Sequence, residues 1–206
     1  MIVIAPNILV IHPFVPAGTV QEFIQYAKSN AQTRRLNYST FGNGSTPHLI
    51  AEMFSSAAGI AMLHVPYKGG GPALAAVMGG EVQLTFSNLS VALPQVQGGK
   101  VRGIAVTSAR RATALPELPT VAESGLAGFE AIASVGILAP AGTPRTLLLR
   151  VNQDVHAVVV APAMKEHFIS RGLEISLSTP EEFARYIRTE IDRWSKVVRD
   201  AGIRAH

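Results

Sequence analysis

The sequence contains no cysteine, which excludes disulfide bonds, thiol catalysis and cysteine-based zinc sites. Charged residues make up only 16% of the chain, and no apolar run approaches the roughly 20 residues that span a bilayer. The net charge of +4 is scattered, and its close basic pairs are Arg34-Arg35 and Arg110-Arg111. Because nucleic-acid binding needs a denser basic surface, no nucleic-acid partner is expected. The positive charge favours solubility, with weak steering of anionic ligands as the alternative.

The 206-residue length suits one domain or two small ones and allows a substantial core. The opening residues, Met1 to Pro6, lack the basic region and cleavage site of a signal peptide. No signal peptide is therefore expected within this chain.

A pattern recurs in the middle of the chain: a short apolar strand, a turn of small residues, and a helix with proline near its start. It occupies residues 36–48 and again residues 62–74. Bare N–H groups at such helix starts, together with the positive end of the helix dipole, form an anion site. The two turns together predict a site for a small carboxylate or phosphate.

Periodicity along the rest of the chain predicts alternating strands and helices. Strands or extended segments are expected at 7–12, 36–40, 60–65, 82–86, 101–107, 131–139 and 173–177. Helices are expected at 19–29, 47–58, 72–78, 90–97, 143–160, 163–170 and from Ser178 onward. This alternation predicts an α/β fold with a mainly parallel sheet. In such sheets, ligands bind beyond the carboxyl ends of the strands, where both glycine turns are expected.

Helix signals are strongest at two capping boxes and in the last helix. Thr19 with Glu22, and Thr120 with Glu123, have the spacing of capping boxes, and Gly125 is expected to end the second segment. The last helix is expected to bury an apolar face, formed by Phe183, Ile187, Ile191, Trp194 and Val198.

Motifs for catalysis are incomplete. Gly42–Pro47 begins like a dinucleotide fingerprint, but proline replaces its third glycine. His48 and Glu52 are one helical turn apart without an evident third metal ligand, which favours an exposed pair or a capping partner. His64 is expected to be a satisfied, half-buried histidine. Because no base, nucleophile and oxyanion donor converge, we expect a binding protein without enzymatic activity, cofactor or metal.

Six segments, in this order, resemble the Bug family of extracytoplasmic solute receptors, the substrate-binding subunits of tripartite tricarboxylate transporters. The segments are Leu36–Leu49, His64–Ala73, Phe86–Leu89, Val106–Arg111, Leu118–Gly125 and Leu138–Pro144. The resemblance extends from Pro6 to Ile203.

This resemblance implies a two-lobed, periplasmic-binding-protein-like fold of type II (Venus flytrap). It implies that residues 8–138 form the second lobe and residues 139–206 the C-terminal part of the first. The implied ligand is a small organic carboxylate, the implied partners are membrane permease subunits, and the implied location is the periplasm. Carried over by motif, the ligand-binding residues are Thr40, Gly42, Gly44, Ser45, Thr46, Tyr67, Lys68, Gly69, Ser87 and Asn88.

One departure from the family concerns its usual N-terminal part. Family members carry a signal peptide and a strand–helix–strand segment with a Pro-Gly-Gly turn before the point that matches Met1. We therefore expect an incomplete first lobe, with homo-oligomerisation or strand exchange through it as a hypothesis. Two alternative functions stay open, an enzyme that uses the same anion site and a sensory module that does not transport. The residues do not indicate which carboxylate binds.

Overall fold

A computed structural model describes residues 1–31 and 36–203, so the Arg34-Arg35 pair lies outside the described residues. The elements, in chain order, are β1 (Val3–Ile11), α1 (Val20–Asn30), β2 (Leu36–Thr40), α2 (Thr46–Ala58), β3 (Met62–Pro66), α3 (Gly70–Met78), β4 (Leu84–Asn88), α4 (Leu89–Gln97), β5 (Arg102–Val106), β6 (Ile132–Val135), α5 (Arg145–Val159), α6 (Pro162–Ile169), β7 (Glu174–Ile175) and α7 (Pro180–Asp200). None of the described helices combines the length and apolar character needed to cross a membrane.

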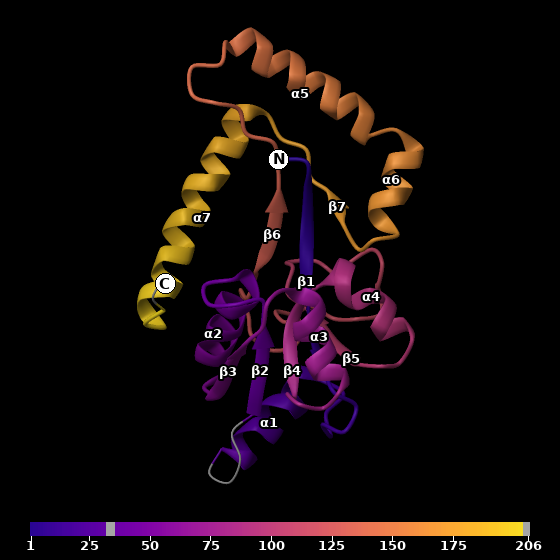
Figure 1. Ribbon diagram of the computed structural model, residues 1–206, viewed down its shortest axis with the longest axis vertical. Helices are drawn as coiled ribbons and strands as arrows, with labels where there is room; N and C mark the ends of the chain where they lie inside the picture. The colour runs from indigo at the N-terminus through magenta and orange to yellow at the C-terminus, as the bar shows by residue number, and fades with distance from the viewer. Residues whose placement is uncertain (32–35, 204–206) are drawn as a thin grey trace.

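The main sheet has the strand order β3-β2-β4-β1-β5 (Figure 1). Strand β2 pairs in parallel with β3 and β4, whereas β1 pairs antiparallel with β4, β5, β6 and β7. Among the described strands, β1 therefore opposes all the others, which share one direction. The expected α/β class with mainly parallel strands is confirmed, and β1 is the exception.

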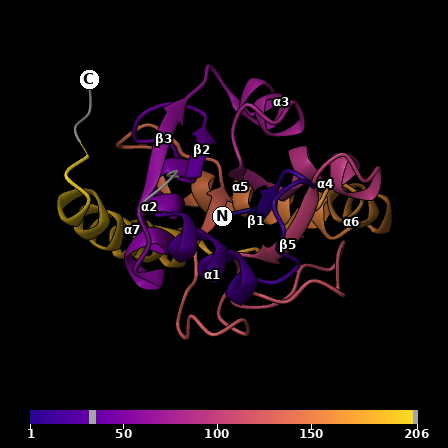
Figure 2. The same ribbon diagram turned by 90° about the horizontal axis from the view of Figure 1, so that it is seen from below.

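Two helix layers cover this sheet, and Figure 2 shows them around it. Helices α1 and α2 contribute Phe23 and Phe54 to a core on one face, where Phe86 of β4 also lies. Helices α3 and α4 contribute Leu74 and Leu93 to a second core on the other face. Because both faces are covered, β4 is buried up to Ser87, and its last residue, Asn88, is half-buried.

Strand β1 connects two groups of strands. Residues Asn7–Ile11 pair with β4, whereas Val3–Pro6 pair with β6 and residues 3–4 pair with β7. The change of partners from β4 to β6 falls between Asn7 and Pro6. Figure 1 shows β1 continuing upward from the main sheet to the level of β6 and β7. This strand therefore ties the glycine-turn region to the C-terminal helices.

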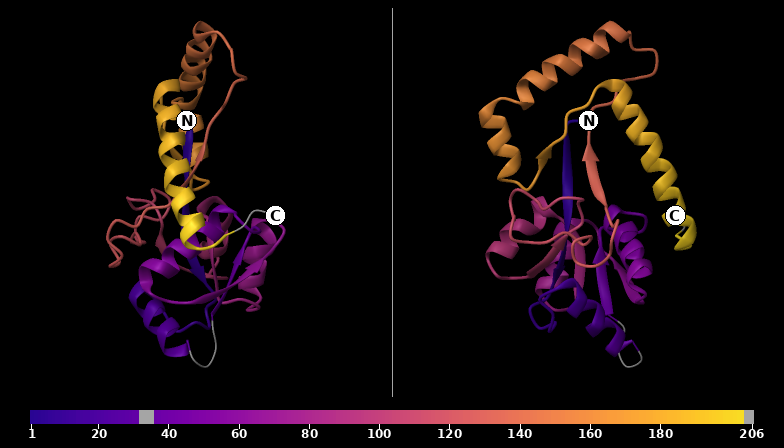
Figure 3. Two further views of the ribbon diagram at one scale, coloured as in Figure 1. Left: turned by 90° about the vertical axis from the view of Figure 1, so that its left-hand side faces the viewer. Right: turned by 180° about the vertical axis from the view of Figure 1, so that it is seen from behind.

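Helices α5, α6 and α7 surround the upper end of β1, and Figure 3 shows how narrow this part is in side view. None of the described residues of α7 is buried, and Ile191 is 58% exposed. The expectation that the apolar stripe of α7 is a buried face is therefore wrong. The other four residues of the stripe are only half-buried, because the described chain packs against one side of α7 alone. These residues are Phe183, Ile187, Trp194 and Val198.

The expected caps are present, with one difference in what they cap. Thr19 and Glu22 form both bonds of a capping box at the start of α1. Thr120 and Glu123 also bond reciprocally, at 2.8 and 3.0 Å, but they close a turn and not an α-helix. Gly125, with φ of +100°, ends that turn after a few residues.

Candidate functional site

The first glycine turn, between β2 and α2, is tied by hydrogen bonds within itself. The N–H of Gly42 donates to Oγ1 of Thr40 at 3.2 Å, and the N–H of Gly44 donates to Nδ1 of His48 at 3.1 Å. The hydroxyl of Ser45 donates to the carbonyl of Gly42 at 2.7 Å. The backbone donors of Gly42 and Gly44 are thus engaged in shaping the turn, which limits them as anion donors.

Backbone N–H groups without a partner in the helix follow directly after this turn, at the start of α2. Ser45 is the N-cap, and the N–H of Leu49 is bonded back to its carbonyl at 3.1 Å. Pro47 has no N–H, so helix geometry leaves the N–H groups of Thr46 and His48 without a partner inside α2. These two donors lie at the positive end of a 13-residue helix, which is the arrangement that binds an anion.

Two stacked histidines support this turn. The rings of His48 and His64 are nearly parallel, at 17°, with centroids 3.8 Å apart, and Tyr38 stacks on His64 at 5.2 Å. Nε2 of His64 lies 2.6 Å from Oγ1 of Thr40. Burial, and then the neighbouring His48, lower the pKa of His64 to about 4. Burial also lowers the pKa of His48, with a partial offset from Glu52.

Neutral imidazole is therefore the form present near pH 7, and Nδ1 of His48 then accepts the Gly44 N–H. The hydroxyl of Tyr38 donates to Oε1 of Glu52 at 2.5 Å, which occupies the carboxylate one turn along α2. Among the described residues, no third potential metal ligand accompanies His48 and Glu52.

The second glycine turn lies directly beside the first. The N–H of Tyr67 donates to the carbonyl of Thr40 at 2.9 Å, and a Cβ on Gly70 would come within 3.1 Å of the Phe41 ring. Gly69, at φ of +111°, is the N-cap of α3. The Tyr67 hydroxyl donates to Glu81 at 3.1 Å. That exposed bond occupies the hydroxyl of Tyr67 and leaves its ring as the part available to a ligand.

Lys68 is exposed and belongs to none of the ion pairs that the described residues form. Its ammonium group is therefore available at the edge of the second turn. An exposed lysine of this kind adds a modest, salt-sensitive attraction for an anion.

Ser87 and Asn88 end β4, the neighbour of β2 in the sheet. Ser87 is buried, and its hydroxyl makes a long contact of 3.4 Å to the carbonyl of Asn88. Asn88 is the N-cap residue of α4, but its side chain makes no capping bond, and its Oδ1 is buried without a partner. An N-cap asparagine that does not cap is free for another role.

The predicted site residues therefore come from three consecutive strand ends. Those of the first two turns are joined by the Thr40–Tyr67 bond, and Ser87 and Asn88 end the adjacent strand. The sequence reasoning missed the stacking of His48 on His64 and the buried Asn7. A polar residue within the otherwise apolar stretch from Ile2 to Ile11 was the available signal for Asn7.

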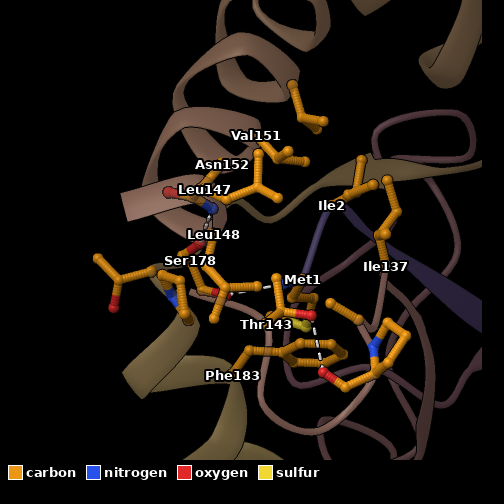
Figure 4. A pocket seen from close by; sticks show the side chains of 15 residues that line it. Met1, Ile2, Ile137, Thr143, Leu147, Leu148, Val151, Asn152, Ser178 and Phe183 are labelled. Carbon is orange, nitrogen blue, oxygen red and sulfur yellow. Dashed lines mark hydrogen bonds between the residues drawn. The ribbon is translucent and has the colours of Figure 1, made fainter. Parts of the chain in front are cut away.

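A separate apolar groove of about 320 Å³ lies between α5 and the start of α7 (Figure 4). Its walls include Ile2, Leu147, Val151 and Phe183, and none of the predicted site residues. The amide of Asn152, which also lines it, already donates to the carbonyl of Ser178 at 3.0 Å. The lining of this groove is mainly apolar, so a carboxylate would lose much of its hydration there, which makes the glycine turns the better candidate for an anion site.

The structure defines an α/β protein with two paired glycine turns, and comparison with known proteins gives the family. The family model of the tripartite tricarboxylate transporter family receptor matches residues 1–203. The chain belongs to this family.

Relatives of known sequence and structure agree with that assignment. Protein BugT of Bordetella pertussis is 31% identical over 197 residues, which cover 96% of this chain and 60% of BugT. The solved structure of R. palustris Rpa4515 with adipate has 35% identity and a TM-score of 0.88, covering 98% of this chain and 67% of that one. MatC of Rhodopseudomonas palustris, solved with bound malate, has 27% identity and a TM-score of 0.80, covering 95% and 67%.

The expected type of fold, that of periplasmic binding proteins of the Bug type, is confirmed by these structures. This chain spans about 60% of the length of the curated relatives that it matches.

Proposed function

We propose that the chain binds a small organic carboxylate at the two glycine turns and the end of β4, as the solute receptor of a tripartite transporter. Its partners would be membrane permease subunits, and its place of action the periplasm. The observation that carries the proposal is the pair of N–H groups, of Thr46 and His48, left open at the start of α2 beside the second turn. The adipate and malate in the two solved relatives support a carboxylate as ligand.

The proposed clamp uses neutral donors and one exposed cation. An anion at a helix start gains about 0.3–1 kcal/mol from the dipole at an exposed site, and up to ~2 kcal/mol when partly buried. Charge-assisted hydrogen bonds from the two N–H groups add to this. These donors recognise the carboxylate alone, so the rest of the ligand must be recognised elsewhere in the site.

An enzyme that uses the same site is not favoured. His48 Nδ1 accepts the Gly44 N–H, and His64 Nε2 is bonded to Thr40, whose side chain is fully buried. The hydroxyl of Ser45 is bonded to a carbonyl rather than to a base. A general base must reach the proton that it abstracts, and neither histidine has a free nitrogen directed at an accessible hydroxyl in these bonds. A sensory module with the same binding site remains the alternative.

Removing a single N–H at the start of α2 tests the site. In Thr46→Pro the first helical residue loses its N–H, and proline fits this position because it is favoured at N1 and Ser45 before it is extended. The matched control, Thr46→Ala, keeps the N–H and loses only the hydroxyl. In titration calorimetry with adipate and malate, we expect Thr46→Pro to weaken binding about tenfold, close to the value of one charge-assisted bond. Equal affinities for Thr46→Pro and Thr46→Ala would remove this N–H from the clamp.

A homo-oligomer through the C-terminal segment, residues 139–206, is the second part of the proposal. Of the eleven large apolar side chains exposed among the described residues, six lie within this segment, between Leu147 and Ile191. Exposed apolar surface of this extent favours a partner, and we commit to a second copy of the chain. Size-exclusion chromatography with light scattering should give a dimer that Ile191→Lys converts to monomer. A monomer at every concentration would rule out the second copy, leaving a polypeptide equivalent to the remaining third of the solved relatives as occupant.

A further inference from the structure

Three of the four buried side-chain atoms that lack a hydrogen-bond partner among the described residues belong to two asparagines. They are Nδ2 and Oδ1 of Asn7 and Oδ1 of Asn88, and the fourth is Oγ of Ser55 in α2. The side chain of Asn7 is completely buried. A buried amide atom without a partner costs about 1–3 kcal/mol, so three of them together call for a binding partner outside the protein.

These two side chains share one place in the sheet. Asn7 and Asn88 are directly opposite in the antiparallel pairing of β1 with β4. Opposite residues in such a pair point to the same face, with Cβ atoms roughly 4.5–5.5 Å apart. The two amides, called here the amide pair, are therefore neighbours, and the half-buried Asn88 connects the buried Asn7 to the surface.

The position of the amide pair is also distinctive. Asn7 is the residue at which β1 changes partners, from β4 to β6 at Pro6. Asn88 ends the strand next to β2 and adjoins Ser87 of the proposed clamp. The amide pair thus lies at the β4 end of the proposed clamp.

The chemistry of the unmatched atoms is specific. The two Oδ1 atoms are acceptors that lack donors, and the Nδ2 group of Asn7 is a donor that lacks an acceptor. A carboxylate supplies acceptors only. A hydroxyl or ammonium group supplies donors for the two oxygens, and a hydroxyl also accepts from the amide.

We propose that the amide pair binds a hydroxyl or amino substituent of the carboxylate ligand, directly or through one water, and so selects substituted over plain acids. This inference rests on the proposed carboxylate-binding function. The start of α2 would hold the carboxylate, and the amide pair would set which carbon skeleton is preferred.

Two acids that differ by one hydroxyl test the proposal. Titration calorimetry on the full chain uses succinate with malate, and adipate with 2-hydroxyadipate. The wild-type protein should bind at least one hydroxy acid about tenfold more tightly than its plain partner, because a site built around a hydroxyl rejects the analogue that lacks it. In Asn7→Leu, which keeps the volume and loses both polar atoms, the hydroxy acid should fall to the level of the plain acid. The affinity for the plain acid should stay within about twofold.

A second variant and a control keep the result clear if Asn7→Leu fails to fold. Asn88→Ala removes a half-buried side chain that makes no capping bond, and it should abolish the same preference. Ser55→Ala removes the remaining unpaired buried oxygen, away from the site, and should leave the preference unchanged.

Each outcome decides the question. Equal wild-type affinities within both acid pairs, or an equal loss for both acids in Asn7→Leu, would overturn the role of the amide pair and leave the proposed function intact. Binding of none of the four acids by the wild-type protein would overturn both.

Discussion

His48 of α2 and His64 of β3 stack with ring centroids 3.8 Å apart, and each supports the first glycine turn through a different atom of that turn. His48 accepts the N–H of Gly44, and His64 bonds to the hydroxyl of Thr40. Because the two imidazoles face each other, a proton on one disfavours a proton on the other, in addition to the effect of burial. The shape of the candidate site therefore depends on both rings being neutral.

The first prediction is that stability falls as pH is lowered through the histidine range. The pKa of His64 is about 4 in the folded state and about 6.5 in the unfolded chain, so below pH 6.5 the unfolded state binds protons more readily. The free energy of unfolding should decline between pH 6.5 and 4 and stay nearly constant just above that range. Urea unfolding at pH 7.5, 6 and 5 measures this.

The control for that prediction is His64→Gln, which keeps a hydrogen-bonding side chain and does not titrate. Its stability should be lower than that of the wild-type protein at pH 7.5, with a smaller difference at pH 5. Parallel pH profiles for the two proteins would contradict the assignment to His64.

A second prediction concerns Gly44, whose φ of +70° lies in the left-handed region. A Cβ there meets nothing within 4 Å, so the backbone conformation alone limits substitution. Gly44→Val should cost about 1–3 kcal/mol of stability, and Gly44→Asn distinctly less, because asparagine tolerates this region. Thermal unfolding of both variants measures the difference, and equal melting temperatures would mean that the turn relaxes to another conformation.

A third prediction concerns Gly172, the residue of the C-terminal segment that packs against Leu89 of α4. It has φ of +69°, and a Cβ would come within 2.8 Å of Cγ of Leu89 in α4. Gly172→Ala therefore combines backbone strain with a clash against a fully buried side chain. We expect a loss of at least about 2 kcal/mol in chemical unfolding. Gly142→Ala, also at positive φ but with nothing within 4 Å of its Cβ, is the control and should lose only the strain part.

Much of this fold follows from local signals in the sequence. The α2 boundaries follow from Pro47 at its start and Gly59 in the left-handed conformation at its end, and β2 falls at the expected residues 36–40. The burial of α7 could not be predicted in the same way. The sequence of the helix shows an apolar stripe, but it does not show whether another layer of the protein covers that stripe. Asn88 was among the predicted site residues, but its pairing with Asn7 could not be predicted, because the two are 81 positions apart and meet only through the pairing of β1 with β4. Whether the ten predicted ligand-binding residues contact a ligand remains a prediction.

The last prediction compares two threonines that make the same local bonds in different settings. Thr179 accepts the N–H of Glu182 at 3.2 Å at the start of the 21-residue α7, and Thr120 accepts the N–H of Glu123 at 3.0 Å in a short turn. Thr179→Ala should cost about 1 kcal/mol, the usual value of an N-cap. Thr120 is fully buried, so Thr120→Ala adds a small cavity and leaves the N–H of Glu123 without its acceptor, and it should cost more than Thr179→Ala. Urea unfolding of the two variants gives the order, and a larger loss for Thr179→Ala would mean that α7, despite its exposed face, limits the stability of the whole chain.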